Sequence, residues 1–400
     1  MTEKIRSDDM IFFAMILLTI TVTFATGVAS VAVGIGSIAL IYRICKDKKI
    51  PPEIDNEILK IFFIYLSLEF MIAVGSIDPI KSFREFGGEI HRLLPIFFAL
   101  ISITNPRRLQ IFAIAFLISC LVNDCYAFYQ HFELEMERIV GFAKNPNMLS
   151  SFQLAQLPML IFFATRENFP IAIRVLSILV ALGKIFILIF TWTRGAWIAL
   201  LICGIVFVIL DKRAMKFFGI AALIFITMFA FNSKLQDRLE TLSNFEFATT
   251  RERKLMWDST LDIIIDYPLH GIGQSMFERM YNSEYISPDA WERPDENGKG
   301  HTQPHNNFLK AACEGGIIGL AGFIILHGYF FKRAWKIYRD DSNSISIGTI
   351  LILILLGIQI EGLTETNLNQ TPIVREYFLL IGTLLAAEKF LNAKKIEDRN

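Results

Sequence analysis

The sequence has little charge for its size. Of its 400 residues only 20% are charged, whereas 53% are hydrophobic and 36 are Phe. A soluble domain of this length would lack the polar surface needed to cover it. The formal net charge is zero, which argues against nucleic acid as a partner. The composition therefore predicts a polytopic membrane protein.

The sequence also lacks a metal-binding pattern. Its five cysteines show no metal spacing, because Cys120 and Cys125 are five residues apart with no second pair to match them. We expect these cysteines to be packing residues. The polar residues Asp295–Asn297 are adjacent, yet no EF-hand loop, HExxH or Cys/His pattern surrounds them. We expect neither a metal nor another cofactor.

Long apolar runs define the fold class that we expect. A bilayer core of about 30 Å needs roughly 20 apolar residues per helical span, and the alternation typical of barrel strands is absent. The sequence predicts an all-α bundle of about twelve transmembrane helices. The expected spans are 10–27, 29–45, 58–77, 91–104, 109–130, 147–165, 171–192, 195–211, 214–231, 306–331, 345–363 and 374–392. The first run continues into the second without a small-residue cleavage site, so it predicts a span and not a signal peptide.

The spans divide the chain into three parts. Residues 1–231 hold nine predicted spans, residues 232–304 form a long hydrophilic loop, and residues 305–400 hold three spans and a tail. Lys and Arg are concentrated in every second connection, which places both termini in the cytoplasm by the positive-inside rule. The long loop is then periplasmic.

Part of this loop has a helical pattern. In "RERKLMWDSTLDIIIDYPLHGIG" the apolar residues Leu255, Leu261, Ile264 and Ile265 recur near helical spacing. The "DYP" sequence ends the helix, and the glycines after it turn the chain. We expect an amphipathic helix lying over the mouth of the membrane domain.

Several arginines lie where the topology predicts few basic residues. The short outer connections carry Arg84, Arg92, Arg138, Arg194 and Arg375. Snorkelling to lipid headgroups or pairing with an acid would explain any one of them equally well. Arg194 stands out because "TWTRGAWIAL" joins two apolar runs with almost no loop. A guanidinium held there matches the geometry of a phosphate.

Two further arginines open the loop helix. Arg251 and Arg253 are separated by one residue and so project in different directions, while Arg253 and Trp257 share a face at i, i+4. We expect Arg253 to point inward with Trp257. A purely solvated charge cluster is the alternative.

The stretch "HTQPHNNFLKAACEGGIIGL" places a polar cluster at the start of an apolar run. Pro304 and the two asparagines that follow His305 can start and cap a helix, which would hold the imidazole at the outer interface. A histidine titrates near neutral pH and can accept a proton from a sugar hydroxyl. Taken alone, a histidine at this position is more often a structural residue at the start of a helix. Glu314, deeper in the run, is costly in an apolar setting and should face the bundle interior.

Four segments in the same order resemble the O-antigen ligase family, from roughly Arg138 to Gln370. "RIVGFAKNPNMLSSF" resembles its Gly…Asn-Pro-Asn segment, and "FTWTRGAWIAL" resembles its Thr-x-Ser/Thr-Arg-Gly segment. "RKLMWDSTLDIIIDYPLHGIGQSMF" resembles its Arg-x-x-x-Trp…Pro-x-x-Gly-x-Gly helix, and "PHNNFLKAACEGGIIGL" resembles its His-Asn…Glu-x-Gly-x-x-Gly segment. The match aligns Arg253 and not Arg251 with the family's arginine.

The resemblance implies transfer of a glycan from an undecaprenyl diphosphate carrier to an acceptor hydroxyl at the outer face of the bacterial inner membrane, without metal or nucleotide. Arg194 and Arg253 would hold the diphosphate, and His305 would activate the hydroxyl. A single in-line displacement would then invert the anomeric carbon. The residues to which we assign substrate positioning are Arg138, Asn147, Asn306 and Glu314.

The family's acceptors leave alternatives open. Ligation of O-antigen to lipid A-core is the first hypothesis, and an O-antigen polymerase or a protein O-oligosaccharyltransferase would share the same fold. A transporter or flippase predicts ionisable residues near the bilayer midplane. Here these are few (Glu69, Asp124 and Lys184), and no internal repeat supports transport. The resemblance fades before Arg138, so it assigns no role to Arg84 or Arg92.

Overall fold

The computed structural model describes residues 2–240, 248–291, 301–340 and 345–397, and its regular structure in these ranges is helical, without strands. The predicted all-α class is therefore confirmed. The polar residues Asp295–Asn297 lie outside the described residues. The helices in chain order are α1 (Thr2–Thr21), α2 (Thr26–Asp47), α3 (Asn56–Gly75), α4 (Pro79–Leu93), α5 (Pro95–Ser102), α6 (Pro106–Phe132), α7 (Pro146–Thr165), α8 (Ile171–Phe190), α9 (Arg194–Leu210), η1 (Lys212–Ala214), α10 (Met215–Ala230), α11 (Ser233–Glu240), α12 (Ala248–Asp266), α13 (Phe277–Met280), η2 (Tyr281–Tyr285), α14 (Pro288–Trp291), α15 (Asn307–Asp340), α16 (Ile347–Glu361), η3 (Asn367–Asn369) and α17 (Thr371–Glu397).

Seven helical segments of the described chain are long and apolar enough to cross a membrane. They are α2, α3, α6, α7, α8, the segment Lys212–Ala230 and α15, and the apolar helices α9 and α16 are shorter. A multispanning membrane protein is thus supported, while the number twelve stays a prediction. The prediction of one membrane-spanning helix at 91–104 is wrong, because this segment is divided between the end of α4 and α5. Pro95 begins a new helix there, and the eight residues of α5 reach only about 12 Å.

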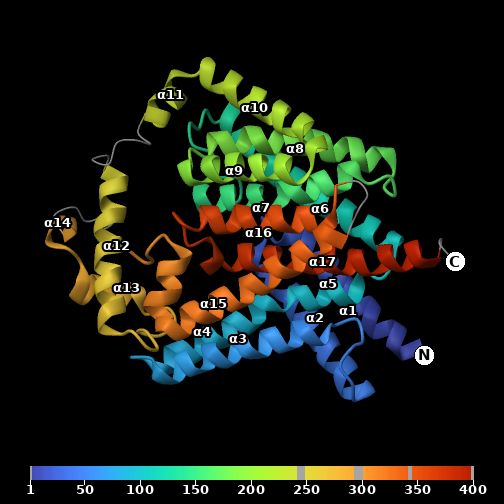
Figure 1. Ribbon diagram of the computed structural model, residues 1–400, viewed down its shortest axis with the longest axis horizontal. Coiled ribbons are helices and arrows are strands. Elements are labelled where there is room, and N and C mark those ends of the chain that lie inside the picture. The colour runs from blue at the N-terminus through green and yellow to red at the C-terminus, as the bar shows by residue number, and fades with distance from the viewer. Residues whose placement is uncertain (1, 241–247, 292–300, 341–344, 398–400) are drawn as a thin grey trace.

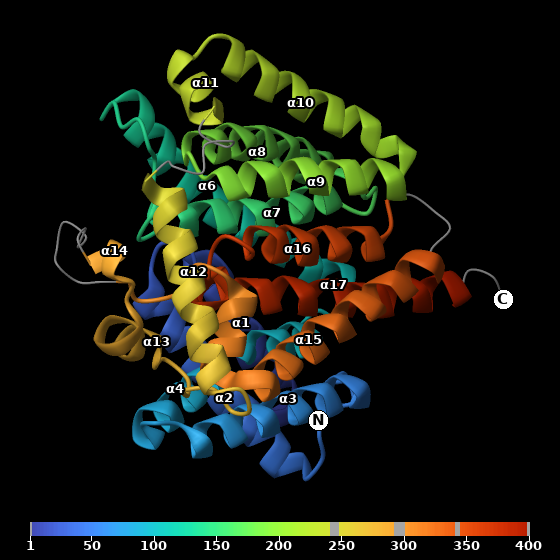
Figure 2. The same ribbon diagram turned by 60° about the vertical axis from the view of Figure 1, so that its left-hand side comes forward.

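The bundle is built around α7. Inside its most apolar window 89% of the residues are buried, against 11% for the segment that contains α10. Figure 1 shows the bundle helices running side by side, with α12 lying crosswise over one end. The start of α1 and the end of α17 lie at the opposite end (Figure 1). Figure 2 shows the same crosswise α12 from a second direction.

Two helices of the bundle begin with the same Asn-Pro signal. Asn105 caps α6 by accepting a hydrogen bond from the backbone N–H of Arg108, and Asn145 caps α7 by accepting one from that of Met148. Proline follows each cap, where its missing N–H costs nothing and its fixed φ favours the helix. The cap at Asn145 sets where α7 starts, and so places Asn147 in the first turn of this helix.

The helix α15 is broken at Gly316, which has φ 59° and ψ −153°. The span predicted at 306–331 is therefore not continuous. Backbone groups at the break bond to the loop after α12. The Ile317 N–H donates to the Pro268 carbonyl (2.8 Å), and the Glu314 carbonyl accepts from Gly273 N–H (2.8 Å). The loop thus satisfies polar groups that an interrupted membrane helix would leave unpaired.

Close backbone contact explains the glycines at this junction. A Cβ on Gly316 would lie 2.5 Å from the backbone carbon of Leu269, and one on Gly271 would lie 2.4 Å from that of Glu314. Both glycines also have positive φ, which L side chains rarely adopt. The Pro-x-x-Gly-x-Gly and Glu-x-Gly segments are therefore two sides of one packed junction.

The buried face of α12 differs from the predicted one. Met256, Thr260 and Ile263 are fully buried, whereas Leu261 is 47% exposed and Ile265 is 73% exposed. Met256 and Ile263 pack in a small core with Phe277, Tyr281 and Cys313. Periodicity alone could not identify the buried stripe, because apolar residues occupy both sides of this helix. The predicted amphipathic helix over the membrane stays a prediction.

We predict that Gly316→Ala destabilises the protein by at least about 2 kcal/mol, because the new methyl group would meet backbone atoms in a strained conformation. Gly328→Ala, in the same helix with open space around its Cα, is the control. Thermal unfolding of the purified proteins in detergent measures the difference. Equal melting temperatures for the two variants would contradict the role of the junction.

Candidate functional site

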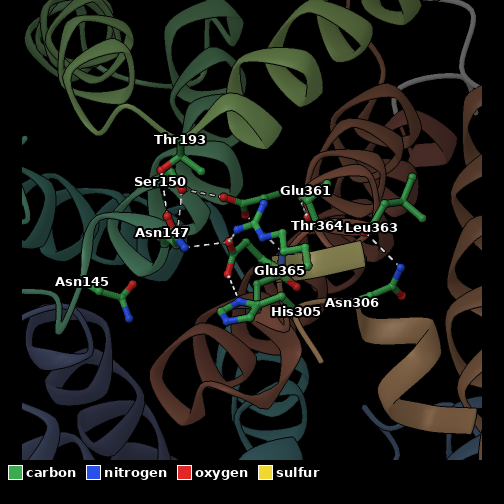
Figure 3. A network of polar contacts seen from close by, with 12 residues as sticks. Asn145, Asn147, Ser150, Thr193, His305, Asn306, Glu361, Leu363, Thr364 and Glu365 are labelled. Carbon is green, nitrogen blue, oxygen red and sulfur yellow. Dashed lines mark hydrogen bonds and ion pairs between the residues drawn. The ribbon is translucent and has the colours of Figure 1, made fainter. Parts of the chain in front are cut away.

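Glu365 lies at the centre of a polar cluster in the turn between α16 and η3. Its side chain is 7% exposed, and its carboxylate accepts hydrogen bonds from three different segments. The donors are His305 through Nδ1 (2.9 Å), Asn147 through Nδ2 (2.6 Å) and the Arg253 guanidinium. Figure 3 shows Asn147 and His305 reaching Glu365 from different sides. A buried carboxylate that accepts all of these hydrogen bonds holds its donors together.

His305 is fixed by its neighbours on both sides. The preceding carbonyl, that of Pro304, accepts a hydrogen bond from Trp257 Nε1 on α12 (2.8 Å). On the other side, Asn306 caps α15 by accepting from the backbone N–H groups of Phe308 (2.8 Å) and Leu309 (3.0 Å). His305 itself has a positive φ of 47°. Its imidazole is therefore held on a tight turn and does not belong to a freely moving loop.

The contact with Glu365 selects the form of the His305 ring. Because a carboxylate only accepts hydrogen bonds, the facing Nδ1 of His305 carries the proton in the neutral ring. The other nitrogen, Nε2, is then the basic one. A carboxylate that orients an imidazole in this way also stabilises the positive charge that follows protonation at Nε2.

Asn147 and Arg138 extend the cluster toward the start of α9. The Asn147 Oδ1 accepts from Arg138 Nη2 (3.0 Å) and from Thr193 Oγ1 (3.1 Å). Arg138 also donates through Nε to the Thr191 carbonyl (2.8 Å). Burial lowers the pKa of Arg138, Glu365 raises it and Arg253 lowers it further. An arginine remains protonated despite such a shift, so two guanidiniums act on each other across this site.

The structure brings the backbone of Arg194 beside the same cluster. Arg194 is the first residue of α9, and Thr193 before it contacts Asn147. A Cβ on Gly195 after it would lie 2.2 Å from Thr364 Oγ1, next to Glu365 in sequence. The connection from α8 is only three residues long, as the sequence predicts, and Trp192 takes a positive φ within it. Arg194 is half-buried at this position.

A second carboxylate lies beneath the cluster. Glu361 is fully buried and accepts hydrogen bonds from Ser150, Ser151 (2.6 Å) and Asn367 (3.1 Å). Sequence reasoning missed both Glu361 and Glu365. The signal was present in "EGLTET", where two acids four residues apart end an apolar run, and the energetic cost that drew attention to Glu314 applies equally to them.

Glu314 does not join this cluster. It bonds to Lys310 of its own helix and to the backbone N–H of Phe277, and it lines a separate cavity that also contains Arg92. Arg84 lies exposed on α4. Arg375 donates to His91 (2.9 Å). Of the seven predicted site residues, the structure joins His305, Arg253, Arg138 and Asn147 through their side chains. It places the backbones of Arg194 and Asn306 beside them and separates Glu314 from them.

The arginines at the start of α12 take different directions. Arg253 bonds to Glu365, whereas Arg251 is 45% exposed and lies 3.9 Å from Asp289.

Within the described ranges, no group of three His, Cys, Asp or Glu side chains could hold a metal ion. The donor set of the cluster is rich in N–H groups, which suits the recognition of an anion.

Comparisons with known proteins agree with the motifs. A family model described as O-antigen ligase matches residues 176–324. The chain is 23% identical over 375 residues to an O-antigen ligase of Salmonella typhimurium, covering 87% of this chain and 88% of that protein. It is 29% identical over 164 residues, 38% of each chain, to a Rickettsia conorii protein described provisionally as a polysaccharide ligase. The resemblance drawn from the motifs is confirmed, because residues 176–324 match the O-antigen ligase family model and the chain is similar to an O-antigen ligase over most of its length.

Proposed function

We propose that this protein transfers a glycan from undecaprenyl diphosphate to an acceptor hydroxyl at the outer face of the bacterial inner membrane, joining O-antigen to lipid A-core. The observation that carries the proposal is the convergence of Arg253, His305 and Asn147 on the buried Glu365 carboxylate. The names of the relatives, an O-antigen ligase and a polysaccharide ligase, support the choice of ligation.

The charge of the cluster suits a diphosphate donor. The guanidiniums of Arg138 and Arg253 and the carboxylate of Glu365 leave a net formal charge of +1. Arg194, whose backbone lies beside them, would raise this charge to +2. A diphosphate joined to a lipid and a sugar carries about two negative charges. Guanidinium forks bind such oxygens in pairs and need no metal to do so. Their charge acts most strongly as the leaving group becomes more negative.

His305 is the general base in this mechanism. Its Nε2 takes the proton of the acceptor hydroxyl while the hydroxyl oxygen forms a bond to the anomeric carbon. The bond from that carbon to the diphosphate breaks at the same time, and its electron pair stays on the diphosphate oxygen. Glu365 stabilises the imidazolium that results. Attack opposite the leaving group inverts the anomeric carbon.

The arrangement of the helices supports an orientation with the site in the periplasm. The cluster lies under α12, at the end of the bundle opposite to the start of α1 and the end of α17 (Figure 1). Basic residues are concentrated toward the termini and in every second connection. We therefore place both termini in the cytoplasm, with about twelve crossings and α12 lying over the outer mouth.

A strain without this gene tests the reaction and the base together. Complementation with the parent should restore the long-chain ladder of lipopolysaccharide on a gel, whereas His305→Ala should reduce transfer by about 10²–10⁴-fold. His301→Ala, in the same polar stretch, should restore the ladder.

The gel also separates the related reactions. Loss of the ladder with polymer accumulating on the lipid carrier means ligation, and a core with a single repeat means polymerisation instead. An unchanged ladder in the deletion strain would overturn the proposed function. Full rescue by His305→Ala would overturn the assignment of the base.

We expect Arg253→Lys to lower kcat/KM by about 10- to 100-fold, because lysine cannot form the paired bonds of a guanidinium. Arg251→Lys is the matched control, since Arg251 is exposed two residues away in the same helix. The rate of transfer by purified enzyme, measured against donor concentration, gives kcat/KM for both variants. Similar kinetics for both variants would exclude bidentate binding of the diphosphate by Arg253.

Glu365→Gln should lower kcat by at least about 10²-fold, because an amide can donate to Nδ1 and leave the wrong ring nitrogen basic. Glu365→Asp keeps the charge and should recover part of the lost kcat. A role in stability alone would instead lower the melting temperature of both variants and leave kcat per folded molecule near that of the parent.

A further inference from the structure

A second polar cavity lies beside the cluster and has no part in the mechanism above. Its volume is about 120 Å³, and its walls come from α3, α4, the loop after α12, the first turns of α15 and η3. The polar side chains that decide its chemistry are Glu69, Glu85, Glu89, Arg92, Lys310 and Glu314. The mouth lies toward Glu85, whose side chain is 34% exposed, and the floor lies toward Glu314, which is 9% exposed.

The cavity borders the chain segments that carry His305 and Glu365. Asn307 and Asn369 both line it. Asn369 donates to the side chain of Gln303 (3.2 Å), two residues before His305, and Asn307 lies two residues after it. Glu365 begins the turn that leads to Asn369. A group bound in the cavity is therefore next to the segments that carry the reacting base.

The charge of the cavity is opposite to that of the arginine cluster. Four carboxylates face two cations, so the net formal charge of the lining is −2. Arg92 pairs with Glu89 (3.0 Å), and Lys310 pairs with Glu314. Such a cavity disfavours a phosphate group and favours groups that donate hydrogen bonds. Sugar hydroxyls are donors of this kind.

Some acceptor capacity in the cavity is unused. Glu69 bonds to the neutral amide of Gln274 (2.9 Å), and the Oε1 atom of Gln274 is buried without a hydrogen-bond partner among the described residues. Ile72 and Phe323 add apolar surface. Carboxylate and amide oxygens beside an apolar face suit the hydroxyl groups and the C–H face of one sugar ring.

We propose that this cavity binds an uncharged, polyhydroxylated sugar ring of the acceptor and presents its hydroxyl to His305. The volume admits several water molecules, which is the scale of a single ring. The inference rests on the proposed function, because it assigns the acceptor of that reaction. The acidic cavity takes the neutral acceptor, and the arginine cluster takes the anionic donor.

Kinetics of three variants test the assignment. Glu69→Gln removes a charge from the lining, and Ala311→Leu fills the cavity without changing a charged contact. Glu278→Gln, on the exposed side of α13, is the control. The rate of glycan transfer by purified enzyme in nanodiscs is measured first at varied concentrations of lipid A-core and then at varied concentrations of undecaprenyl-diphosphate-linked glycan. Both cavity variants should raise the KM for the acceptor about tenfold and leave that for the donor within about twofold.

A binding measurement keeps the test independent of turnover. The core oligosaccharide released from lipopolysaccharide is separated into phosphate-free and phosphate-bearing fractions, and each is added to the purified protein. The phosphate-free fraction should raise the melting temperature of the parent and of Glu278→Gln, but not that of Ala311→Leu.

Three results would overturn the proposal. These are an unchanged acceptor KM in both cavity variants, an equal rise in donor KM, and stronger stabilisation by the phosphate-bearing fraction. If the parent enzyme transfers no glycan, the proposed function fails, and the melting temperatures still decide whether the cavity binds sugar.

Discussion

The buried carboxylate of Glu365 is the contact on which the arrangement of the site depends. It joins α7 through Asn147, α12 through Arg253 and the start of α15 through His305. These segments lie far apart in the sequence, and each brings one N–H donor to the same charge. Removing a partner would leave a buried charge with one donor fewer, which costs more than a surface contact. One negative charge therefore fixes both a guanidinium and an imidazole.

Below this site a polar stripe continues along α7 into the bundle. Its members are Asn147, Ser150, Ser151, Gln153 and Gln156, which contact the acids Glu365, Glu361, Asp124 and Glu376. Lys184 is fully buried and pairs with Asp124 (3.0 Å) while donating to Gln153 (3.0 Å). Asp124 and Lys184, two of the three inward charges that a transport hypothesis would use, are thus bonded between helices and link α6, α7 and α8.

Sequence reasoning succeeded where a local signal was strong. The asparagine cap after His305, the short connection before Arg194 and the apolar runs could be identified from neighbouring residues alone. It failed where the answer depended on distant segments. The apolar run after Asn307 has no gap in hydropathy at Gly316. The loop that satisfies the break, Pro268–Gly273, comes from more than 40 residues earlier in the chain, so no neighbouring residue signals it. Glu365 was missed for the same reason, since its partners come from three other segments.

The break in α15 has a consequence for how the chain assembles in the membrane. Until the loop at Pro268–Gly273 has docked, the carbonyls of Cys313 and Glu314 and the amide of Ile317 lack their partners. An unpaired backbone group in a lipid environment costs several kcal/mol. The loop is synthesised first and lacks these partners until α15 has formed. Insertion of this helix and docking of the loop are therefore one cooperative event, and the site forms only when it is complete.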